Sequence, residues 1–343
     1  MKMNPTLNQH LKNQLIGASI SGGLTAIFMY VLFYQGHQSL VAGFCIGFFV
    51  YIGISAYTTN IERKFLGKAN LFIVLLINSL AQILIIFIIA WFFVGIFYLD
   101  GKFSKMMINF TDLISGFFSI GILFGVVLSV FFNFYSIVTT IIGKNILGKL
   151  FLGMYRNPTE TDRIFMFLDI TSSTSIAEKI GHLKFLSLVN DFFYDIIEPI
   201  RETKGEIYKY VGDEVIITWK TKEGVDKVNC VRCFFLIEDK INQKAEYYSS
   251  KYGIVPGFKA GMHGGLVVTG ELGFTKREIA FMGDVVNTTA RIEEACKTFS
   301  KRFIISEYLV QKIGSIPDII FTHVGNVKLR GKEAELNLFA AEK

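Results

Sequence analysis

Residues 163–174 read Arg-Ile-Phe-Met-Phe-Leu-Asp-Ile-Thr-Ser-Ser-Thr, an apolar run that ends in an acid and continues into small hydroxyl side chains. A short, continuously apolar run is typical of a strand buried on both faces. Asp169, near the end of this strand, offers a hard oxygen ligand for a metal ion, and Thr171 and Thr174 stand where a helix begins, beside amides suited to phosphate. The simpler alternative is that Asp169 only caps that helix.

A second acidic residue lies about forty residues further on. Residues 205–215 read Gly-Glu-Ile-Tyr-Lys-Tyr-Val-Gly-Asp-Glu-Val, and Gly212-Asp213 in the middle of this run predicts a tight hairpin between two strands. If these strands pair with the first one, Asp213 meets Asp169 at one edge of the sheet. Two convergent carboxylates are typical of a two-metal site for phosphoryl transfer, so together they carry more weight than either alone.

The surrounding sequence alternates between strand and helix patterns. After the strand 163–170 we expect a helix to about 204, strands 205–211 and 214–219, a helix near 225–251 and a strand 257–269. The pattern continues with a strand 278–282, a helix 284–299, a strand 302–306, a short helix and a closing strand pair within 319–339. The β-α-β-β-α-β start predicts an α/β (α+β) sandwich of the ferredoxin-like kind over 161–343.

The helix expected from Asp284 carries a third motif. Residues 283–291 read Gly-Asp-Val-Val-Asn-Thr-Thr-Ala-Arg, which places Asn287 and Arg291 four residues apart on one helix face. An amide and a guanidinium on one face can orient a sugar and neutralise charge on a phosphate, although a solvated polar face is the plainer interpretation. Near the C-terminus, Arg330-Gly331-Lys332 forms a basic tip that suits a triphosphate.

The N-terminal part of the chain is strongly apolar. The whole chain is 51% hydrophobic and 19% charged, and four stretches, 15–34, 39–59, 71–99 and 113–142, are each long enough to cross a bilayer. We therefore expect an all-α anchor of four transmembrane helices over 1–142 and a helical linker over 143–160.

The distribution of charge predicts the orientation of this anchor. Residues 1–156 hold ten Lys and Arg against three acids, whereas the rest of the chain holds 25 against 26. Eight of the ten basic residues fall in segments on one side of the predicted spans, which predicts a multi-pass protein of the cell (inner) membrane with both termini cytoplasmic. Because the basic excess belongs to the apolar half, it argues against a nucleic-acid partner. Four scattered Cys exclude a secreted disulfide framework.

Four motifs occur in the same order as in a known family of enzymes. The segments 167–170, 209–213, 283–291 and 330–332 resemble those of the catalytic domain of class III nucleotidyl cyclases, over about 160–340. The resemblance implies that Asp169 and Asp213, with the carbonyl of Ile170, hold two Mg²⁺ or Mn²⁺ ions. It further implies conversion of ATP to cyclic AMP and pyrophosphate.

The resemblance also implies roles for residues that approach the substrate. Asn287 would orient the ribose, Arg291 would stabilise the charged transition state, and Lys332 would hold the departing phosphates. Lys209 stands where adenylate cyclases keep a lysine against the adenine ring. Ala280 departs from the family pattern, because it replaces a polar residue that reads the base. A guanylate cyclase or a cyclase of dual specificity is therefore the alternative.

In the family, each site lies between two catalytic domains. One chain carries both sets of residues, so the resemblance implies a homodimer formed through the catalytic domains and the membrane helices, with membrane lipid as a further partner. A catalytically silent, membrane-bound nucleotide sensor or scaffold is the alternative of another class. A diguanylate cyclase is disfavoured because the segment 211–215 lacks the first Gly and the Phe of that family's turn.

Overall fold

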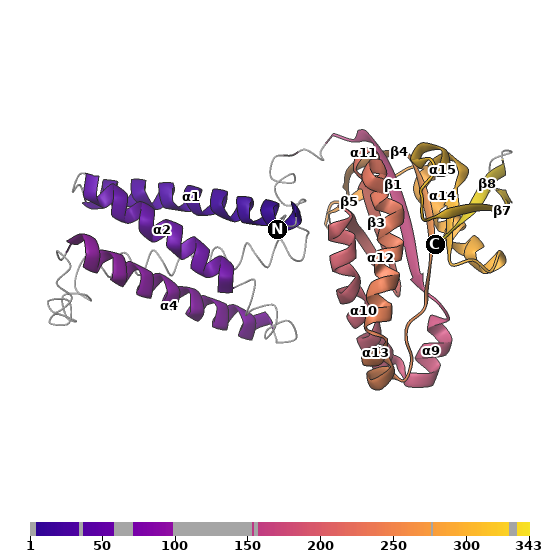
Figure 1. Ribbon diagram of the computed structural model, residues 1–343, viewed down its shortest axis with the longest axis horizontal. Helices are drawn as coiled ribbons and strands as arrows, with labels where there is room; N and C mark the ends of the chain where they lie inside the picture. Colours follow the sequence, from indigo (N-terminus) through magenta and orange to yellow (C-terminus); the bar gives the residue numbers. More distant parts are fainter. Residues whose placement is uncertain are drawn as a thin grey trace. The chain divides into compact units, whose positions relative to one another are not determined.

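The computed structural model describes residues 5–33, 37–57, 71–98, 153, 157–275, 277–328 and 335–343, which belong to two compact units (Figure 1). The first unit runs from Met1 to Lys149 and the second from Leu150 to Lys343.

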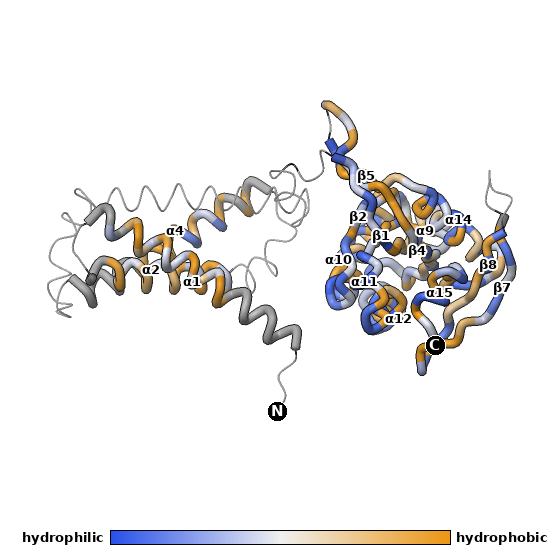
Figure 2. Tube along the Cα trace, turned by 90° about the horizontal axis from the view of Figure 1, so that it is seen from above, coloured by the Kyte–Doolittle hydropathy of each residue, from blue (hydrophilic) through white to orange (hydrophobic). Residues whose placement is uncertain are grey.

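The described part of the first unit is helical. It comprises α1 (Pro5–Phe33), α2 (His37–Tyr57) and α4 (Leu71–Tyr98), whose apolar residues appear in Figure 2 as orange segments. Among the described residues, Leu40–Tyr57 in α2 is the one segment long and apolar enough to cross a membrane, judged by length and composition. The apolar segments Leu15–Phe28 and Leu76–Ile89 are shorter.

Polar side chains in these apolar helices bond to neighbouring helices. Tyr57 in α2 donates a hydrogen bond from its hydroxyl to Asn78 Oδ1 in α4, over 3.0 Å. Ser21 in α1 donates to the carbonyl oxygen of Gly47 in α2, also over 3.0 Å. Such bonds hold helices together where surrounding side chains are apolar. They favour a structural role for these polar groups over a pathway for ions.

The predicted anchor is only partly covered by these helices. The first three predicted spans coincide with α1, α2 and α4, and the fourth, 113–142, lies outside the described residues. The linker expected over 143–160 also lies largely outside them, and its last residues belong to a strand, because β1 begins at Thr159. The four-helix transmembrane anchor therefore stays a prediction.

The second unit contains an eight-stranded sheet. Its strands are β1 (Thr159–Ile170), β2 (Glu206–Val211), β3 (Glu214–Lys220), β4 (Phe258–Leu272), β5 (Glu278–Met282), β6 (Phe303–Ser306), β7 (Ile320–Lys328) and β8 (Glu335–Glu342). The main order is β2-β3-β1-β4-β6-β8-β7, with β5 paired to β4. The first four strands are joined as β-α-β-β-α-β and lie in the order 2-3-1-4, which confirms the predicted ferredoxin-like arrangement.

The helices differ from the prediction mainly because two expected helices are divided. The helix expected from the first strand to about 204 is two helices, α9 (Ser173–Ile180) and α10 (His182–Glu202), separated at Gly181. The helix expected near 225–251 is likewise divided, into α11 (Thr221–Val225), a single 3₁₀ turn, α12 (Asn229–Gln243) and α13 (Ala245–Tyr252). The remaining helices, α14 (Asp284–Thr298) and α15 (Glu307–Ile313), match the prediction closely.

The hydrophobic core lies on both faces of the sheet. In β1, Ile164, Met166 and Leu168 face a core shared with α10 and α12, which lie side by side in Figure 1. Phe165 and Phe167 face the opposite way and pack near Val285 of α14. Because the inner part of β1 is covered on both faces, residues 164–170 form a continuous apolar run, and Asp169 is the one charged residue within it.

Candidate active site

The hairpin between β2 and β3 fixes the position of Asp213. Val211 and Glu214 are paired across the two strands, so Gly212 and Asp213 form a two-residue turn. Gly212 has a φ of 65°, a conformation that a side chain disfavours and that two-residue hairpin turns require. The hairpin predicted from the Gly-Asp pair is confirmed.

Strand register brings Asp169 to the same place. Asp169 lies opposite Glu214 of β3 on one side and opposite Lys259 of β4 on the other. Side chains of residues directly opposite each other share a face of the sheet, so Asp169 is flanked by an acid and a base. The helix α9 is capped by Ser172, without a side-chain hydrogen bond. The alternative that Asp169 serves as the cap is therefore wrong.

The carboxyl groups of Asp169 and Asp213 interact directly. Burial, followed by the charge of Asp213 and a hydrogen bond with it, raises the pKa of Asp169 to about 6. Asp213 Oδ2 is buried and has no hydrogen-bond partner among the described residues. A buried carboxylate oxygen without a donor is costly, and close negative charges add to that cost. The structure thus brings two predicted metal ligands together.

Three further charged residues complete this cluster. Lys259 Nζ lies 3.3 Å from Asp169 Oδ2 and also forms a close ion pair with Glu293 of α14. Burial, with the charges of Glu293, Asp169 and Asp213, raises the pKa of Glu214 to about 7. The cluster therefore contains four carboxyl groups and one ammonium group. Such an excess of negative charge favours a bound cation.

A glycine allows α14 to reach this cluster. A Cβ atom added to Gly261 of β4 would lie 2.2 Å from the backbone nitrogen of Glu293 and 2.6 Å from its Cα. The helix backbone therefore packs directly on the strand at this point. Because of that contact, Glu293 is 6% exposed and its carboxylate meets Lys259, two residues before Gly261 in the strand.

Asn287 and Arg291 lie on another face of α14. Asn287 is exposed and Arg291 half-buried, and neither side chain has a hydrogen bond or ion pair with any described residue. Positions 291 and 293 are about 200° apart around a helix. The helix therefore presents Glu293 to the sheet of its own chain and Arg291 in a different direction. The structure does not bring Asn287 or Arg291 into contact with Asp169.

The residues expected to read the base lie near one another on β2 and β5. Lys209 Nζ is 3.5 Å from Glu278 Oε2, and the side chains are 47% and 43% exposed. Ala280 lies two residues after Glu278, so both project from the same face of β5. An acid thus lies beside Lys209, although Ala280 itself cannot form a hydrogen bond through its side chain.

The structure does not test the roles predicted for Ile170, Thr171, Thr174 and Lys332. The backbone amide of Thr171 donates to the carbonyl of Gly257 over 2.9 Å, so it is already engaged within the fold. Thr174 is exposed in the first turn of α9, and Ile170 is buried at the end of β1. Lys332 lies outside the described residues. The phosphate-binding roles of these threonines and of Lys332 stay predictions.

Lys259, Glu293, Glu214 and Glu278 are absent from the residues predicted by motif. Lys259 follows Phe258 at the start of a strand whose first five residues are otherwise apolar or small, an observation that could have drawn attention to it. Glu293 belongs to the Glu-Glu pair 293–294, and only the docking of α14 distinguishes the buried member from the exposed one.

The carboxylates fit a divalent metal. Among the described residues no group of three or more His, Cys, Asp and Glu side chains forms a complete metal centre. However, the two adjacent carboxylates, the unpaired Oδ2 of Asp213 and the hard oxygen chemistry of this donor set suit Mg²⁺ or Mn²⁺. Main-chain oxygen, water and substrate phosphates ordinarily supply the remaining ligands of such ions.

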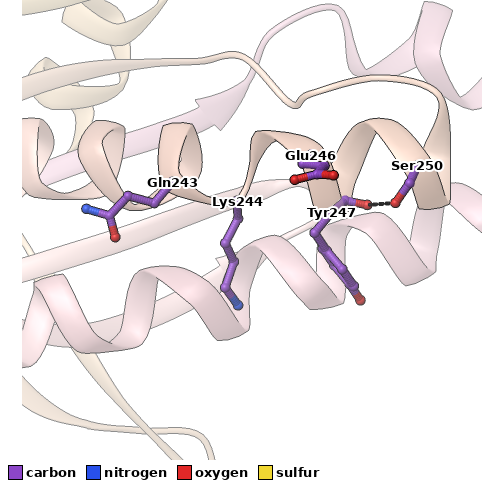
Figure 3. A pocket seen from close by; sticks show the side chains of 5 residues that line it. All are labelled: Gln243, Lys244, Glu246, Tyr247 and Ser250. Carbon is purple, nitrogen blue, oxygen red and sulfur yellow. Dashed lines mark hydrogen bonds between the residues drawn. The ribbon is translucent and has the colours of Figure 1, made fainter.

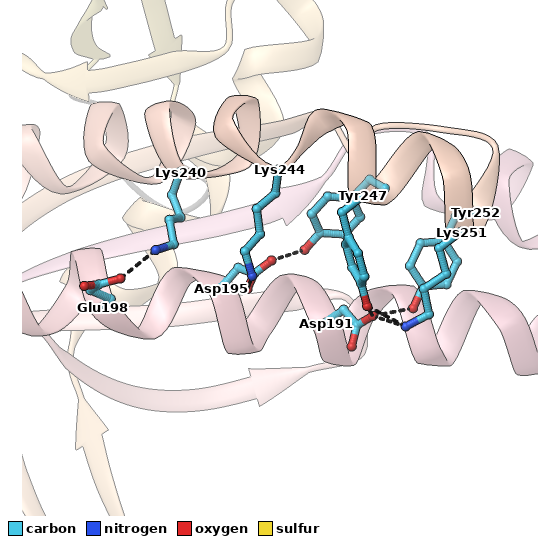
Figure 4. A network of polar contacts seen from close by, with 9 residues as sticks. Asp191, Asp195, Glu198, Lys240, Lys244, Tyr247, Lys251 and Tyr252 are labelled. Carbon is cyan, nitrogen blue, oxygen red and sulfur yellow. Dashed lines mark hydrogen bonds and ion pairs between the residues drawn. The ribbon is translucent and has the colours of Figure 1, made fainter. Parts of the chain in front are cut away.

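Two other polar features lie away from this cluster. A surface pocket at the junction of α12 and α13 is lined by Gln243, Lys244, Glu246, Tyr247 and Ser250, none of them predicted site residues (Figure 3). Nearby, Asp191 and Asp195 of α10 accept hydrogen bonds from Lys244, at the junction of α12 and α13, and from a lysine and tyrosines of α13 (Figure 4). These contacts join helices on one side of the core.

The family to which the chain belongs follows from its sequence. The family described as the adenylate and guanylate cyclase catalytic domain matches residues 157–341, which is more than half of the chain. The chain therefore belongs to this family, as its motifs led us to expect.

Several known proteins are similar to the chain. Adenylate cyclase 2 of Rhizobium meliloti (strain 1021) is 34% identical over 199 residues, covering 58% of this chain and 55% of that protein. Adenylate cyclase of Anabaena cylindrica is 27% identical over 179 residues, covering 51% of this chain and 35% of that protein. The receptor-type guanylate cyclase gcy-7 of Caenorhabditis elegans is 28% identical over 158 residues, covering 44% and 14%. The chain thus spans about half or less of these relatives.

A solved structure shares the fold. A bacterial light-regulated adenylyl cyclase superposes with a TM-score of 0.55 at 17% identity, and the match covers 64% of each chain.

Proposed function

We propose that this chain is a membrane-anchored adenylate cyclase that converts ATP to cyclic AMP and pyrophosphate at the interface of a homodimer. One observation carries the proposal most directly. In a chain of this family, Asp169 and Asp213 lie together at the strand ends, and Asp213 has a buried oxygen with no hydrogen-bond partner in the described part of the chain. A catalytically silent scaffold would have no need to keep so costly an arrangement.

The proposed metal site consists of the Asp169 and Asp213 carboxylates and the carbonyl oxygen of Ile170. When bound there, two Mg²⁺ or Mn²⁺ ions would supply charge neutralisation for the triphosphate and a lower pKa for the ribose 3′-hydroxyl. In the reaction, the 3′-oxygen bonds to the α-phosphorus and the bond to the β-phosphate oxygen breaks. The hydroxyl proton and pyrophosphate leave.

The faces of α14 support a site shared between two copies. Glu293 faces the carboxylate cluster of its own chain, whereas Asn287 and Arg291 lie on other sides of the helix and have no partners among the described residues. A second copy, related by twofold symmetry, would receive them. There Asn287 would orient the ribose and Arg291 would donate to the transition-state phosphate.

The choice of nucleotide rests on Lys209. Its ammonium group can donate to N1 of adenine, whereas N1 of guanine carries a hydrogen and would leave the donor unpaired. Ala280 provides no second hydrogen bond, and its presence, together with a guanylate cyclase among the relatives, makes a guanylate or dual-specificity cyclase the second candidate. Glu278, paired with Lys209, is the acid available to the 6-amino group of adenine.

The N-terminal unit supports attachment to the membrane. Helix α2 has the length and composition of a membrane span, and α1 and α4 are apolar over shorter segments. With the fourth apolar stretch at 113–142, they would form a multi-pass anchor in the cell membrane, with both termini in the cytoplasm. Lipid and a second copy of the chain are the partners of this unit.

The test is a product assay on the purified full-length chain. We would supply ATP or GTP with Mg²⁺ or Mn²⁺ and quantify cyclic AMP, cyclic GMP and pyrophosphate. Asp213→Asn should abolish the product, and Asp318→Asn, a change at an exposed surface acid, should not. Cyclic GMP as the main product would favour the second candidate. A folded protein that makes neither product under any of these conditions would support the silent scaffold.

A further inference from the structure

Lys259 lies between two carboxylates that belong to different parts of the fold. Its Nζ is 3.3 Å from Asp169 Oδ2 on the neighbouring strand, and it forms a close ion pair with Glu293 on the helix above the sheet. The side chains of all three are largely buried, with 21% of Lys259, 24% of Asp169 and 8% of Glu293 exposed. Lys259 is therefore not a surface lysine that meets its partners by chance.

The position of Glu293 is fixed by close backbone packing. Gly261 lets α14 approach β4 so closely that a Cβ atom there would lie 2.2 Å from the nitrogen of Glu293. The carboxylate of Glu293 is consequently buried, and Lys259 is its counter-ion. Removing either partner leaves a buried charge, which is costly. The pair is thus held in place by the sheet and the helix together.

Lys259 also forms an ion pair with Asp169, a proposed metal ligand. A divalent cation held by Asp169 and Asp213 and the ammonium of Lys259 would compete for the negative charge of Asp169. At separations of 4 to 6 Å, two positive charges repel appreciably in a partly buried site. Glu293, which lies on α14 rather than on a neighbouring strand, also attracts Lys259. The negative charge that Asp169 offers to a metal ion therefore depends on how close the Lys259 ammonium lies to Asp169 and how close to Glu293.

We propose that Lys259 and Glu293 together set the affinity of the Asp169–Asp213 site for divalent metal ions. Lys259 weakens metal binding by neutralising Asp169, and Glu293 is a positioning residue that limits this effect by holding the Lys259 ammonium. The inference rests on the metal site of the proposed function, but it concerns residues outside the ligand set.

The experiment measures binding of Mn²⁺ alone to the full-length protein, without nucleotide, by electron paramagnetic resonance of free Mn²⁺. We expect Lys259→Met to lower the Kd for Mn²⁺ about tenfold, because a competing positive charge is removed. Glu293→Gln should raise the Kd several-fold, because Lys259 is then left to Asp169. The double variant should match Lys259→Met, since Glu293 acts through the lysine.

The double variant also keeps the experiment decisive if Lys259→Met does not fold. Lys259→Met alone leaves Glu293 buried without a counter-ion, whereas the double variant removes both charges. Thermal unfolding of each variant identifies the folded ones. The matched controls are Lys301→Met and Glu342→Gln, which disrupt another Lys–Glu pair of the same unit and should leave the Kd for Mn²⁺ unchanged.

Each remaining outcome decides the inference. It is overturned if the wild type binds no Mn²⁺, or if the Kd of the folded double variant is the same as that of the wild type. It is also overturned if Lys259→Met changes only the KM for ATP, because Lys259 then serves the nucleotide alone. The predicted Kd changes without any cyclic nucleotide product would uphold this inference while the proposed function fails. Cyclic AMP production with unchanged Kd values would do the reverse.

Discussion

The environment of Asp213 lowers the stability of the fold and suits the proposed metal site. Among the residues that the structure describes, its buried Oδ2 atom has no hydrogen-bond partner, and its charge lies against Asp169, whose pKa is raised to about 6. Neither feature stabilises the fold. Residues that destabilise the fold in this way are concentrated at functional sites, where the same charges bind a ligand.

Replacement of Asp213 by Asn should therefore stabilise the protein and inactivate it. The amide keeps the shape of the carboxyl group, removes one of two adjacent charges and can donate a hydrogen bond to Asp169. We expect the free energy of unfolding, measured in metal-free buffer, to rise by about 1 kcal/mol. Asp318→Asn, at an exposed position, should change neither stability nor product formation. A loss of stability in Asp213→Asn would contradict this account of the site.

The prediction of individual residues from sequence succeeded where the information is local. Asp169 ends an apolar run and Asp213 belongs to a Gly-Asp turn, and both positions follow from patterns a few residues long. The contacts of Lys259 and Glu293 depend on strand register and on the docking of a helix, which no short pattern records. The pairing of Lys209 with Glu278 likewise joins residues 69 positions apart. Such contacts require the three-dimensional fold.

At the scale of single elements, α14 depends on the absence of a side chain at Gly261. We expect Gly261→Ala to destabilise the second unit by about 1 to 3 kcal/mol, because the added Cβ atom meets helix backbone that cannot move away freely. Chemical denaturation measures the change. The control is Gly257→Ala in the segment before β4, where the nearest atoms to the added Cβ atom lie 3.8 Å away. Similar losses from both variants would contradict close packing as the cause.

The contacts between α10 and α13 predict a dependence on pH. Burial acts to raise the pKa of Asp191, but hydrogen bonds from Lys251, Tyr252 and Tyr247 outweigh it and lower the pKa to about 2. A carboxylate with a lowered pKa stabilises the fold fully above its ordinary value near 3.8, and this stabilisation is lost as the pH falls towards 2.

The variant Asp191→Asn isolates this contribution. The wild type should be more stable than the variant by about 1 to 3 kcal/mol above pH 4, and the difference should shrink as the pH falls from 4 towards 2. Urea unfolding at a series of pH values measures it. Glu246→Gln, an exposed change on α13, serves as the control. A difference that is independent of pH would show that packing rather than charge accounts for the effect.

Element boundaries were predicted less well than element types. The apolar pattern predicts that the first strand begins at Arg163, but β1 begins four polar residues earlier, at Thr159. These four residues pair with the outer half of β4. The long helices expected after the first and third strands are each interrupted, since the sequence remains helical in character across the breaks. Tertiary pairing decides these ends, and local periodicity does not report it.

At the scale of the whole molecule, the division into two units predicts that the catalytic part folds alone. A fragment of residues 150–343 should unfold in one cooperative transition, because its core lies entirely within that unit. We expect its activity per molecule to rise steeply with protein concentration, whereas the full-length protein in a membrane should show a weaker dependence if the proposed anchor concentrates the partner copies. Assays over a hundredfold range of concentration distinguish the two. An activity per molecule independent of concentration in the fragment would contradict the homodimer.

In such a homodimer, helix α14 would connect two reaction centres. One side of it is tied through Glu293 and Lys259 to the carboxylates of its own chain, and Asn287 and Arg291 on its other sides would serve the copy opposite. Each helix then belongs to both reaction centres at once. Loading one centre would shift the free energy of loading the other, so occupancy should deviate from independent binding and yield a Hill coefficient different from one.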